Sequence, residues 1–184
     1  MIALLVILII LAILVLWVIV AYNGLIRRRN RVDNAWSQID VQLKRRLDLI
    51  PNLVETVKGY AAHERQTLEA VINARNAAMA APSSPAAQEQ ADNVLAGALR
   101  QLFALSEAYP DLKANQNFLA LQEELTATEG RVSYARQFYN DSVLAFNTAI
   151  ETFPTVVFAK MLSFTKREYF EAEDAAKQPP QVKF

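Results

Sequence analysis

The chain has 184 residues, with 19 basic and 19 acidic side chains, so its formal net charge at neutral pH is zero. A general nucleic-acid-binding protein needs a basic surplus, and this balance argues against that class. The absence of cysteine excludes disulfides, cysteine-ligated zinc, thiolate nucleophiles and cysteine lipidation. A single histidine and four glycines, with no phosphate-binding glycine run, argue against a metal centre, a Ser-His-Asp triad and a nucleotide loop. We therefore expect no cofactor and no small-molecule substrate.

The first predicted element, Ile2 to Tyr22, carries no charged side chain. As a helix rising about 1.5 Å per residue, it is long enough to span the ~30 Å hydrocarbon core of a bilayer. A cleaved signal peptide would need basic residues before the apolar run, a shorter core and a small-residue cleavage site. The stretch has none of these features, so we predict a retained transmembrane anchor. Trp17 and Tyr22 lie near its end, where aromatic rings favour the membrane interface.

Four arginines follow the apolar stretch: Arg27, Arg28, Arg29 and Arg31. Basic residues are enriched on cytoplasmic flanks, so this asymmetry predicts an external N-terminus and a cytoplasmic C-terminal domain. The same side chains could contact anionic lipid headgroups. Topology alone and lipid contact both remain open as interpretations.

A long helix is predicted from Val32 to near Ala80, because its apolar residues recur at spacings of three and four. They are Val32, Trp36, Ile39, Leu43, Leu47, Ile50, Val54, Val57, Ala61, Leu68, Val71 and Ile72. Such a helix of about 48 residues would be near 70 Å long. It begins either at a capping Asp33 or Asn34, or as a direct continuation of the membrane helix.

Pro51 lies in the middle of this stripe without shifting its phase. We therefore predict one kinked helix rather than two helices. Proline removes the hydrogen bond to the carbonyl of Leu47 and clashes with it, at a cost of about 3 kcal/mol or more. Asn52 and Arg46 stand near that carbonyl in the sequence, and an arginine or a water could satisfy it.

The remaining chain predicts further helices. A turn at Ala81–Pro85 precedes a helix capped by Ser84, with Pro85 at its first position, that ends at Tyr109-Pro110. A third helix is predicted from near Asp111 to Phe153, because a residue before proline is disfavoured in helix. A shorter segment follows at 155–170, and it packs either on the bundle or on the bilayer.

No segment alternates like a half-buried strand, so the predicted fold is all-α. It is an N-terminal transmembrane helix followed by an elongated antiparallel bundle of three to four helices, with long first and third helices. The predicted divisions are an anchor with its basic flank (1–26), a bundle (27–172) and a mobile tail (173–184). The second helix is too short to cover its neighbours, so we hypothesise an overhang that seats a partner or a second copy.

The stretch YNDSVLAFNTAIETFP pairs aromatic and asparagine residues at heptad spacing. Its positions are Tyr139, Asn140, Phe146, Asn147, Phe153 and Pro154. Buried asparagines would fix helix register at a cost in stability. The alternative is that both asparagines lie at the margin of the core and contact water.

Residues that could carry chemistry are few. His63-Glu64 resembles the start of a metalloprotease motif, but Thr67 stands where the second histidine would be. Glu123, Glu124 and Glu129 lack the Glu-x-x-His pattern of a di-iron bundle. We therefore predict a solvated helix-face histidine, a solvated acidic patch and no enzymatic activity.

The sequence resembles the LemA family along nearly its whole length. The resemblance rests on YNGLIRRRNRVDNAWSQIDVQLKRRLDLIPNLVETVKGYAAHE, YPDLKANQNFLALQEEL, RQFYNDSVLAFNTAIETFP and a final YFE. One departure is Ser163-Phe164, where the family often has Gly-Phe, and it concerns the local turn. The IPNLV block around Pro51 belongs to the resemblance, so the kink is expected to be a family feature.

The resemblance implies a small bacterial membrane protein with one N-terminal span and a cytoplasmic helical bundle. It implies no catalytic residue and no cofactor. The family includes a protein of magnetosome membranes, and its members are often linked with membrane metalloproteases. We expect a single-pass protein of the inner membrane that acts as a scaffold or adaptor toward membrane proteins or itself. The alternative is an accessory or regulatory subunit of a membrane protease or envelope-stress system.

Overall fold

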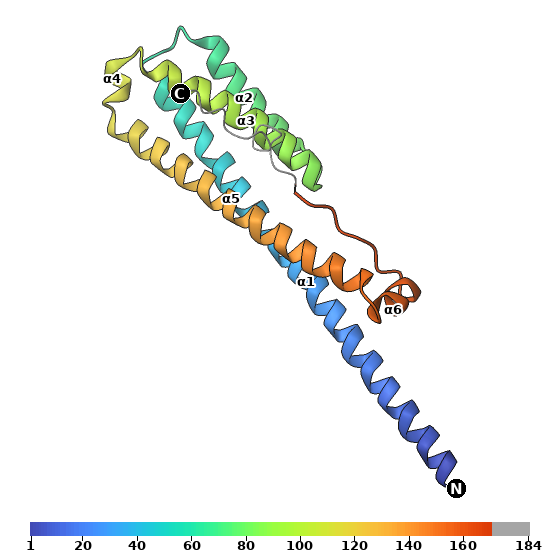
Figure 1. Ribbon diagram of the computed structural model, residues 1–184. Coiled ribbons are helices and arrows are strands. Elements are labelled where there is room, and N and C mark those ends of the chain that lie inside the picture. Colours follow the sequence, from blue (N-terminus) through green and yellow to red (C-terminus); the bar gives the residue numbers. More distant parts are fainter. Residues whose placement is uncertain (171–184) are drawn as a thin grey trace, which may run out of the picture. The chain divides into compact units, whose positions relative to one another are not determined.

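The computed structural model describes residues 1–170, and the tail predicted at 173–184 lies outside them (Figure 1). Within the described part the chain forms helices and no strand, so the predicted all-α class is confirmed. The helices are α1 (Ile2–Lys58), α2 (Arg65–Ala80), α3 (Pro85–Ser106), α4 (Pro110–Lys113), α5 (Gln116–Glu151) and α6 (Thr155–Met161).

The chain divides into two compact units, each of which takes part of α1 and part of α5. The anchor unit comprises residues 1–37 and 137–169. The bundle unit comprises residues 38–136 and, among the described residues, Phe170. The predicted division at residue 26 concerns the membrane boundary and stays a prediction.

The apolar stretch continues directly into the rest of α1, without a cap at Asp33 or Asn34. In the described part of the chain, α1 is the single helix that is long and apolar enough to cross a membrane, with a mean hydropathy of 3.6 in its most apolar window. None of that window is buried within residues 1–170. Burial begins further along, at Leu25 and Val32, which are each 2% exposed.

The predicted first long helix is interrupted, because α1 ends at Lys58 and α2 begins only at Arg65. The amide of Ala61 donates to the carbonyl of Val57 at 2.8 Å, which closes the end of α1. The prediction of one helix to Ala80 is therefore wrong. The spacing misled because α2 folds back on α1, so that its apolar residues resume the same phase and enter the same core.

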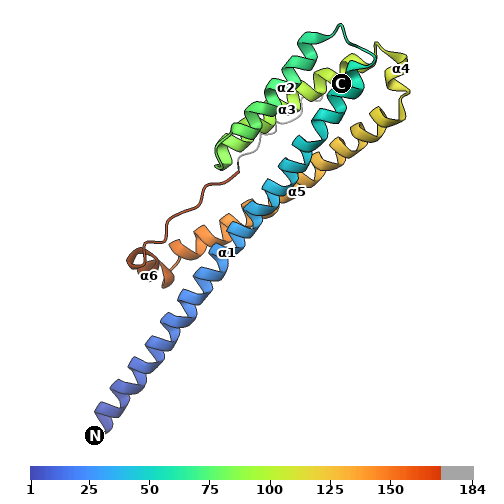
Figure 2. The ribbon, with the colours of Figure 1, turned by 180° about the vertical axis from the view of Figure 1, so that it is seen from behind.

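The core of the bundle unit is built from the apolar stripes of its helices. α2 and α3 lie side by side in both views (Figures 1 and 2). Ser84 caps α3 by accepting a hydrogen bond from the amide of Ala87 at 3.4 Å, with Pro85 in the first turn, as predicted. The largest wholly buried side chains of this core include Ile50, Leu53, Leu95, Leu102, Leu112 and Phe118.

The predicted third helix begins later than expected. The one-turn helix α4 comes first, and α5 starts at Gln116 behind Asn115, whose side chain accepts a hydrogen bond from the amide of Phe118 at 3.0 Å. It ends at Glu151, just before the cis peptide Phe153-Pro154. Within the anchor unit α5 runs antiparallel to α1 (Figure 1).

Candidate interaction site

Pro51 lies inside α1, so the helix runs through the proline as predicted. The carbonyl of Leu47, which proline leaves without its helical partner, accepts a hydrogen bond from Nε of Arg75 at 3.0 Å. Arg75 belongs to α2, and the contact therefore fixes α2 to the C-terminal part of α1. An arginine was expected to bind this carbonyl, and one does, but it is Arg75 rather than Arg46.

Arg46 instead belongs to a buried ionic cluster with Asp92 of α3 and Arg136 of α5. Asp92 accepts from Nη1 of Arg46 at 3.0 Å and from Nη2 of Arg136 at 2.5 Å. The side chains of Arg46 and Asp92 are only 4% and 8% exposed. One carboxylate thus pairs with two guanidinium groups inside the bundle unit and ties three helices together. The nearest further carboxylate is Glu129, 3.9 Å from Arg46 and largely exposed.

Of the acidic side chains expected to form a solvated patch, Glu123 and Glu129 are exposed and Glu124 is half-buried in ion pairs. Glu124 lies 2.7 Å from Arg45 and 3.0 Å from Arg131. These hydrogen bonds and charges, chiefly from Arg131, lower the pKa of the Glu124 carboxyl. His63 is exposed but lies in the turn after α1, so the prediction of a helix-face position is wrong.

Within residues 1–170, no three metal-ligating side chains come together.

In the anchor unit, Asn147 binds the backbone of an extended segment that follows α6. Its Nδ2 donates to the carbonyl of Arg167 at 2.9 Å, and its Oδ1 accepts from the amide of Arg167 at 2.9 Å. About two helical turns earlier on α5, the hydroxyl of Tyr139 donates to the carbonyl of Glu168 at 2.9 Å. Asn147 is 5% exposed and Tyr139 is 4% exposed. We call Tyr139 and Asn147 the backbone clamp.

Further contacts hold the extended segment on the anchor unit. The guanidinium of Arg167 pairs with Asp33 of α1 at 2.7 Å. The ring of Phe164 packs edge-on against Phe146 and Tyr22, with centroids 6.3 Å apart in each case. The backbone clamp therefore binds backbone atoms of the extended segment. The side-chain contacts of Arg167 and Phe164 set which residues of the segment lie against the clamp.

The predicted register positions have different environments. Tyr139, Phe146 and Asn147 are buried, Asn140 is half-buried, and Phe153 and Pro154 are exposed beyond the end of α5. Tyr139 also packs against Trp36, with centroids 5.4 Å apart. Burial raises the pKa of the Tyr139 hydroxyl, which keeps it a hydrogen-bond donor. The idea that these residues specify register between partners stays a prediction.

Ser163 connects α6 to the extended segment with a left-handed backbone, at φ 55°. This is the position at which the LemA family often has glycine. A left-handed conformation brings Cβ close to the following carbonyl oxygen and costs roughly 1–2 kcal/mol for residues other than glycine. The turn is therefore retained here without the residue that adopts it most readily.

The segment after α5 packs on the anchor helix through aromatic rings. Phe158 of α6 meets Trp17 edge-on, with ring centroids 5.2 Å apart. Ala159 is 1% exposed. The other face of the segment is uncovered, since Phe153, Val157, Met161 and Leu162 are between 48% and 85% exposed. One face of α6 thus packs on α1, as the first alternative predicted. The opposite face is the one to which the alternative of packing on the bilayer applies.

The predicted flanking arginines separate into two kinds. Arg29 lies over the ring of Phe164 at 5.9 Å, and Arg31 lies over Phe138 at 5.3 Å, so both have cation–π contacts. All four arginines are exposed, and Arg27 and Arg28 have no such ring contact among the described residues. Ile2, at the start of the helix, is 81% exposed and Tyr22 is 42% exposed.

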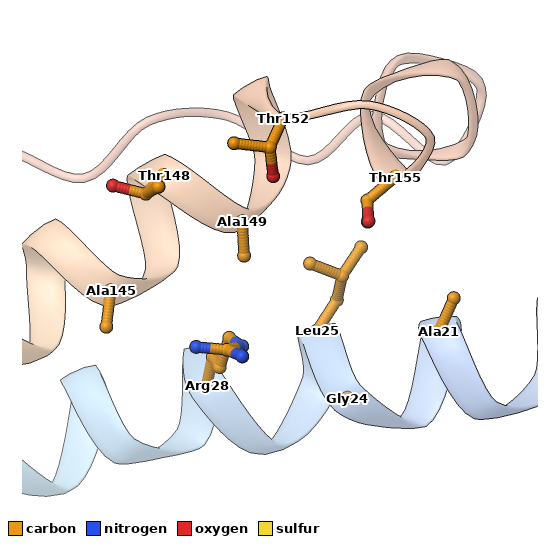
Figure 3. A pocket seen from close by; sticks show the side chains of 9 residues that line it. All are labelled: Ala21, Gly24, Leu25, Arg28, Ala145, Thr148, Ala149, Thr152 and Thr155. Atoms are coloured by element: carbon orange, nitrogen blue, oxygen red, sulfur yellow. The ribbon is translucent and has the colours of Figure 1, made fainter.

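Arg28 contributes to a pocket of about 420 Å³ between α1 and α5 (Figure 3). The lining consists of small and hydroxyl-bearing side chains around one apolar and one charged residue. These are Ala21, Gly24, Leu25, Arg28, Ala145, Thr148, Ala149, Thr152 and Thr155. Thr152 and Thr155 point toward α1, and the Arg28 guanidinium lies between the two helices. We call this cavity the Arg28 pocket.

Sequence reasoning did not identify three of these features. The Asp92 cluster and the Arg75 contact depend on a helix reversal that the apolar spacing conceals. The Arg28 pocket forms where small residues on two helices oppose each other. These residues recur at spacings of three and four, and this spacing is the signal that could have indicated the pocket. They are Ala21 and Gly24 on α1, beside Arg28, and Ala145, Thr148, Ala149 and Thr152 on or just after α5.

Comparison with known proteins adds an independent finding. The sequence profile described as the LemA family matches residues 35–184. "Protein LemA" of Metamycoplasma hominis is 29% identical over 155 residues, covering 83% of this chain and 69% of the relative. "Magnetosome protein MamQ" of Magnetospirillum gryphiswaldense is 24% identical over 189 residues, covering 88% and 70%. "Magnetosome protein MamQ 2" of Paramagnetospirillum magneticum is 23% identical over 183 residues, covering 86% and 67%.

Proposed function

Because the chain belongs to the LemA family, we propose that it is a membrane-anchored helical scaffold or adaptor that acts through protein–protein association, including association with itself. We place it in the bacterial inner membrane, with a single span, an external N-terminus and a cytoplasmic bundle. The proposed role is recognition, and it needs no cofactor or substrate.

One observation carries the proposal: a single helix serves both as anchor and as core. The first part of α1 is uncharged and uncovered, which suits a lipid environment. The later part buries Ile39, Ile50 and Leu53 completely. A helix shared in this way connects the bundle unit directly to the proposed membrane anchor, as a membrane-anchored scaffold requires.

The bundle unit also offers a surface for a partner. A shallow groove of about 320 Å³ lies where α1 and α2 meet the start of α3, lined in part by Asp40, Lys44, Leu47 and Met79. Met79 is 61% exposed, and Lys44 is also exposed. Mixed apolar and charged groups of this kind are typical of non-obligate protein interfaces.

The test is crosslinking in intact membranes. A photo-crosslinking amino acid is placed at Lys44 or Met79 of the full chain, both of which line the groove, with Glu123, an exposed residue outside the groove, as the matched control. We expect a reproducible adduct, with a protein partner or a second copy, from the groove positions and not from the control. Absence of adducts at both groove positions, together with a monodisperse monomer after solubilisation, would contradict the proposal. A membrane protease as the main adduct would favour the accessory-subunit alternative instead.

The proposed orientation has its own test. Reporter fusions after Phe184 are expected to give fluorescence from a cytoplasmic reporter and no alkaline phosphatase activity, because basic residues follow the span. Phosphatase activity without fluorescence would reverse the assigned orientation and leave the anchorage intact.

A further inference from the structure

We propose that α6 rests in the membrane interface and that the Arg28 pocket beside it binds the phosphate of an anionic phospholipid. The inference rests on the membrane anchorage in the proposed function and adds a specific ligand class and its site. All the residues involved belong to the anchor unit.

The depth of α6 follows from its contacts with α1. Phe158 meets Trp17, and Phe164 of the following segment meets Tyr22. Trp17 and Tyr22 are five residues apart, which is about 7.5 Å along a helix. Interfacial helices bury their apolar face roughly 5–10 Å into the boundary between headgroups and acyl chains. With Tyr22 at that boundary, Phe158 lies at the depth of such a helix.

The direction of α6 agrees with this depth. The axes of α5 and α6 differ by 94°, and α5 lies alongside α1 in the anchor unit (Figure 1). If α1 is parallel to the membrane normal, α6 is therefore close to perpendicular to the normal and lies in the plane of the interface.

The uncovered face of α6 fits lipid better than water. Phe153, Val157 and Met161 recur every four residues and are 85%, 50% and 76% exposed, and Leu162 adds to the same patch at 48%. Lys160 is exposed beside them. Apolar residues next to a basic residue are typical of interfacial segments.

The Arg28 pocket has the chemistry of a phosphate site. Arg28 is the one charged residue among its nine lining residues in the described chain. Guanidinium groups bind phosphate oxygens with paired hydrogen bonds, and the hydroxyls of Thr152 and Thr155 can donate to the same oxygens (Figure 3). The nearby carboxylate of Glu151 is paired with Lys166 at 2.5 Å. Ala21 and Gly24 leave room for a headgroup.

The anchor unit as a whole also favours an anionic surface. It carries seven basic and four acidic side chains. Two of the acidic residues, Asp33 and Glu151, are already in ion pairs. An anionic bilayer surface attracts basic side chains close to it.

The depth of α6 is tested with single cysteines, which are clean probes because the chain has none. Val157→Cys and Met161→Cys are spin-labelled in the full chain and reconstituted in phosphatidylcholine–phosphatidylglycerol vesicles. The matched controls are Val94→Cys and Tyr134→Cys, which are 56% and 73% exposed on the bundle unit and lie outside the groove. We expect oxygen to relax the labels at 157 and 161 and a water-soluble nickel chelate to relax those at 94 and 134.

Labels at 157 and 161 that behave like the controls would overturn the interfacial position. Disulfide-linked dimers of Met161→Cys, with low oxygen access, would show a second copy on this face and would equally overturn it. A label at Leu14→Cys serves as a reference within the span. If that label were also nickel-accessible, the anchorage itself would fail, which is a different result.

The phosphate site is tested by native mass spectrometry of the delipidated full chain titrated with phosphatidylglycerol or phosphatidylcholine. Arg28→Gln is expected to weaken the first phosphatidylglycerol by about fivefold, which corresponds to roughly 1 kcal/mol, and to leave phosphatidylcholine unchanged. Arg27→Gln removes the neighbouring charge, which does not line the pocket, and is expected to have less than half that effect. Equal losses in the two variants, or none in Arg28→Gln, would overturn the site.

Discussion

The anchor unit and the bundle unit use the same two helices, α1 and α5, but stabilise them with different chemistry. The anchor unit relies on edge-on aromatic pairs and on Arg29 and Arg31 over aromatic faces. The bundle unit relies mainly on an aliphatic core and on the cluster of Arg46, Asp92 and Arg136, with one edge-on ring pair and with Arg136 over Phe170. Residues 38–136 carry ten basic and twelve acidic side chains, against seven and four in the anchor unit. Along one helix, the side-chain chemistry thus changes from one suited to a membrane boundary to one suited to water.

The largest expected effect would break the bundle unit alone. Asp92→Ala leaves the buried guanidinium of Arg46 and the partly exposed guanidinium of Arg136 without their shared anion, which should cost about 3–5 kcal/mol of unfolding free energy. Hydrogen exchange of the full chain should show lost protection in α2 and α3, with residues 137–151 unaffected. The control Glu129→Ala removes an exposed partner and should change stability by less than about 1 kcal/mol. Uniform loss of protection in both units would contradict this separation.

A matching test addresses the anchor unit. Asn147→Ala removes both hydrogen bonds to the Arg167 backbone and should release the extended segment at a cost of about 1–3 kcal/mol. Trypsin cleavage after Lys166 and Arg167 should accelerate by about tenfold for each 1.4 kcal/mol lost. Asn117→Ala, at an exposed position on α5, serves as the control. Unchanged cleavage would mean that the backbone clamp contributes little.

The link between Pro51 and Arg75 is tested by a double-mutant cycle. Arg75→Met leaves the Leu47 carbonyl without its partner and should destabilise the bundle unit by about 1–3 kcal/mol. In a Pro51→Ala background the amide of residue 51 is available to that carbonyl, so the same substitution should cost clearly less. Denaturant unfolding of the four proteins measures the difference. Equal costs in the two backgrounds would show that Arg75 acts through some other contact.

A smaller gain is expected at the turn after α6. Ser163→Gly removes the left-handed strain at φ 55° but increases the freedom of the unfolded chain. The net result should be a stabilisation of about 0.5–1 kcal/mol, since the strain of roughly 1–2 kcal/mol exceeds the entropic loss. Thermal unfolding measures it, and Ser163→Ala, which cannot relieve the strain, is the comparison. A destabilising glycine would show that the serine side chain itself supports the turn.

The smallest effect concerns pH. The hydrogen bond from Arg131 lowers the pKa of Glu124 in the folded protein. Its stabilising contribution is therefore present above the unfolded carboxyl pKa, near about 4.3, and is lost as pH falls through the lower folded value. Glu124→Gln should flatten this part of the stability profile at acidic pH, measured by unfolding between neutral pH and pH 3. An unchanged profile would assign the acid sensitivity to other carboxyls.

The sequence predicted much of the fold because apolar spacing, caps and prolines act locally. The passage of α1 through Pro51 followed from an unbroken apolar phase, and the cap at Ser84 from residue type. The reversal after Lys58 was not predictable in this way, because Leu68 and Val71 continue the phase of Val57 while entering the same core from a second helix. For the same reason Arg75 could not be identified as the partner of Leu47.

The candidate sites were harder to predict, because their partners are distant in sequence. The positions of Tyr139 and Asn147 within an apolar strip stood out, but nothing local indicated that a segment twenty residues further on would lie against Asn147. The Arg28 pocket likewise depends on the meeting of α1 with α5. Spacing identifies polar residues on a buried face, whereas their partners follow only from the tertiary fold.

The hydrogen bond between Leu47 and Arg75 also bears on the order of folding during synthesis. Arg75 is 28 residues beyond Leu47 and, at about 5–20 residues per second, leaves the ribosome about 1–6 s later. During that interval the membrane-spanning part of α1 is already complete, while the Leu47 carbonyl still depends on water. The helix therefore becomes fully bonded only after α2 has folded back, so the apolar N-terminal part of α1 is complete before the core of the bundle unit can form.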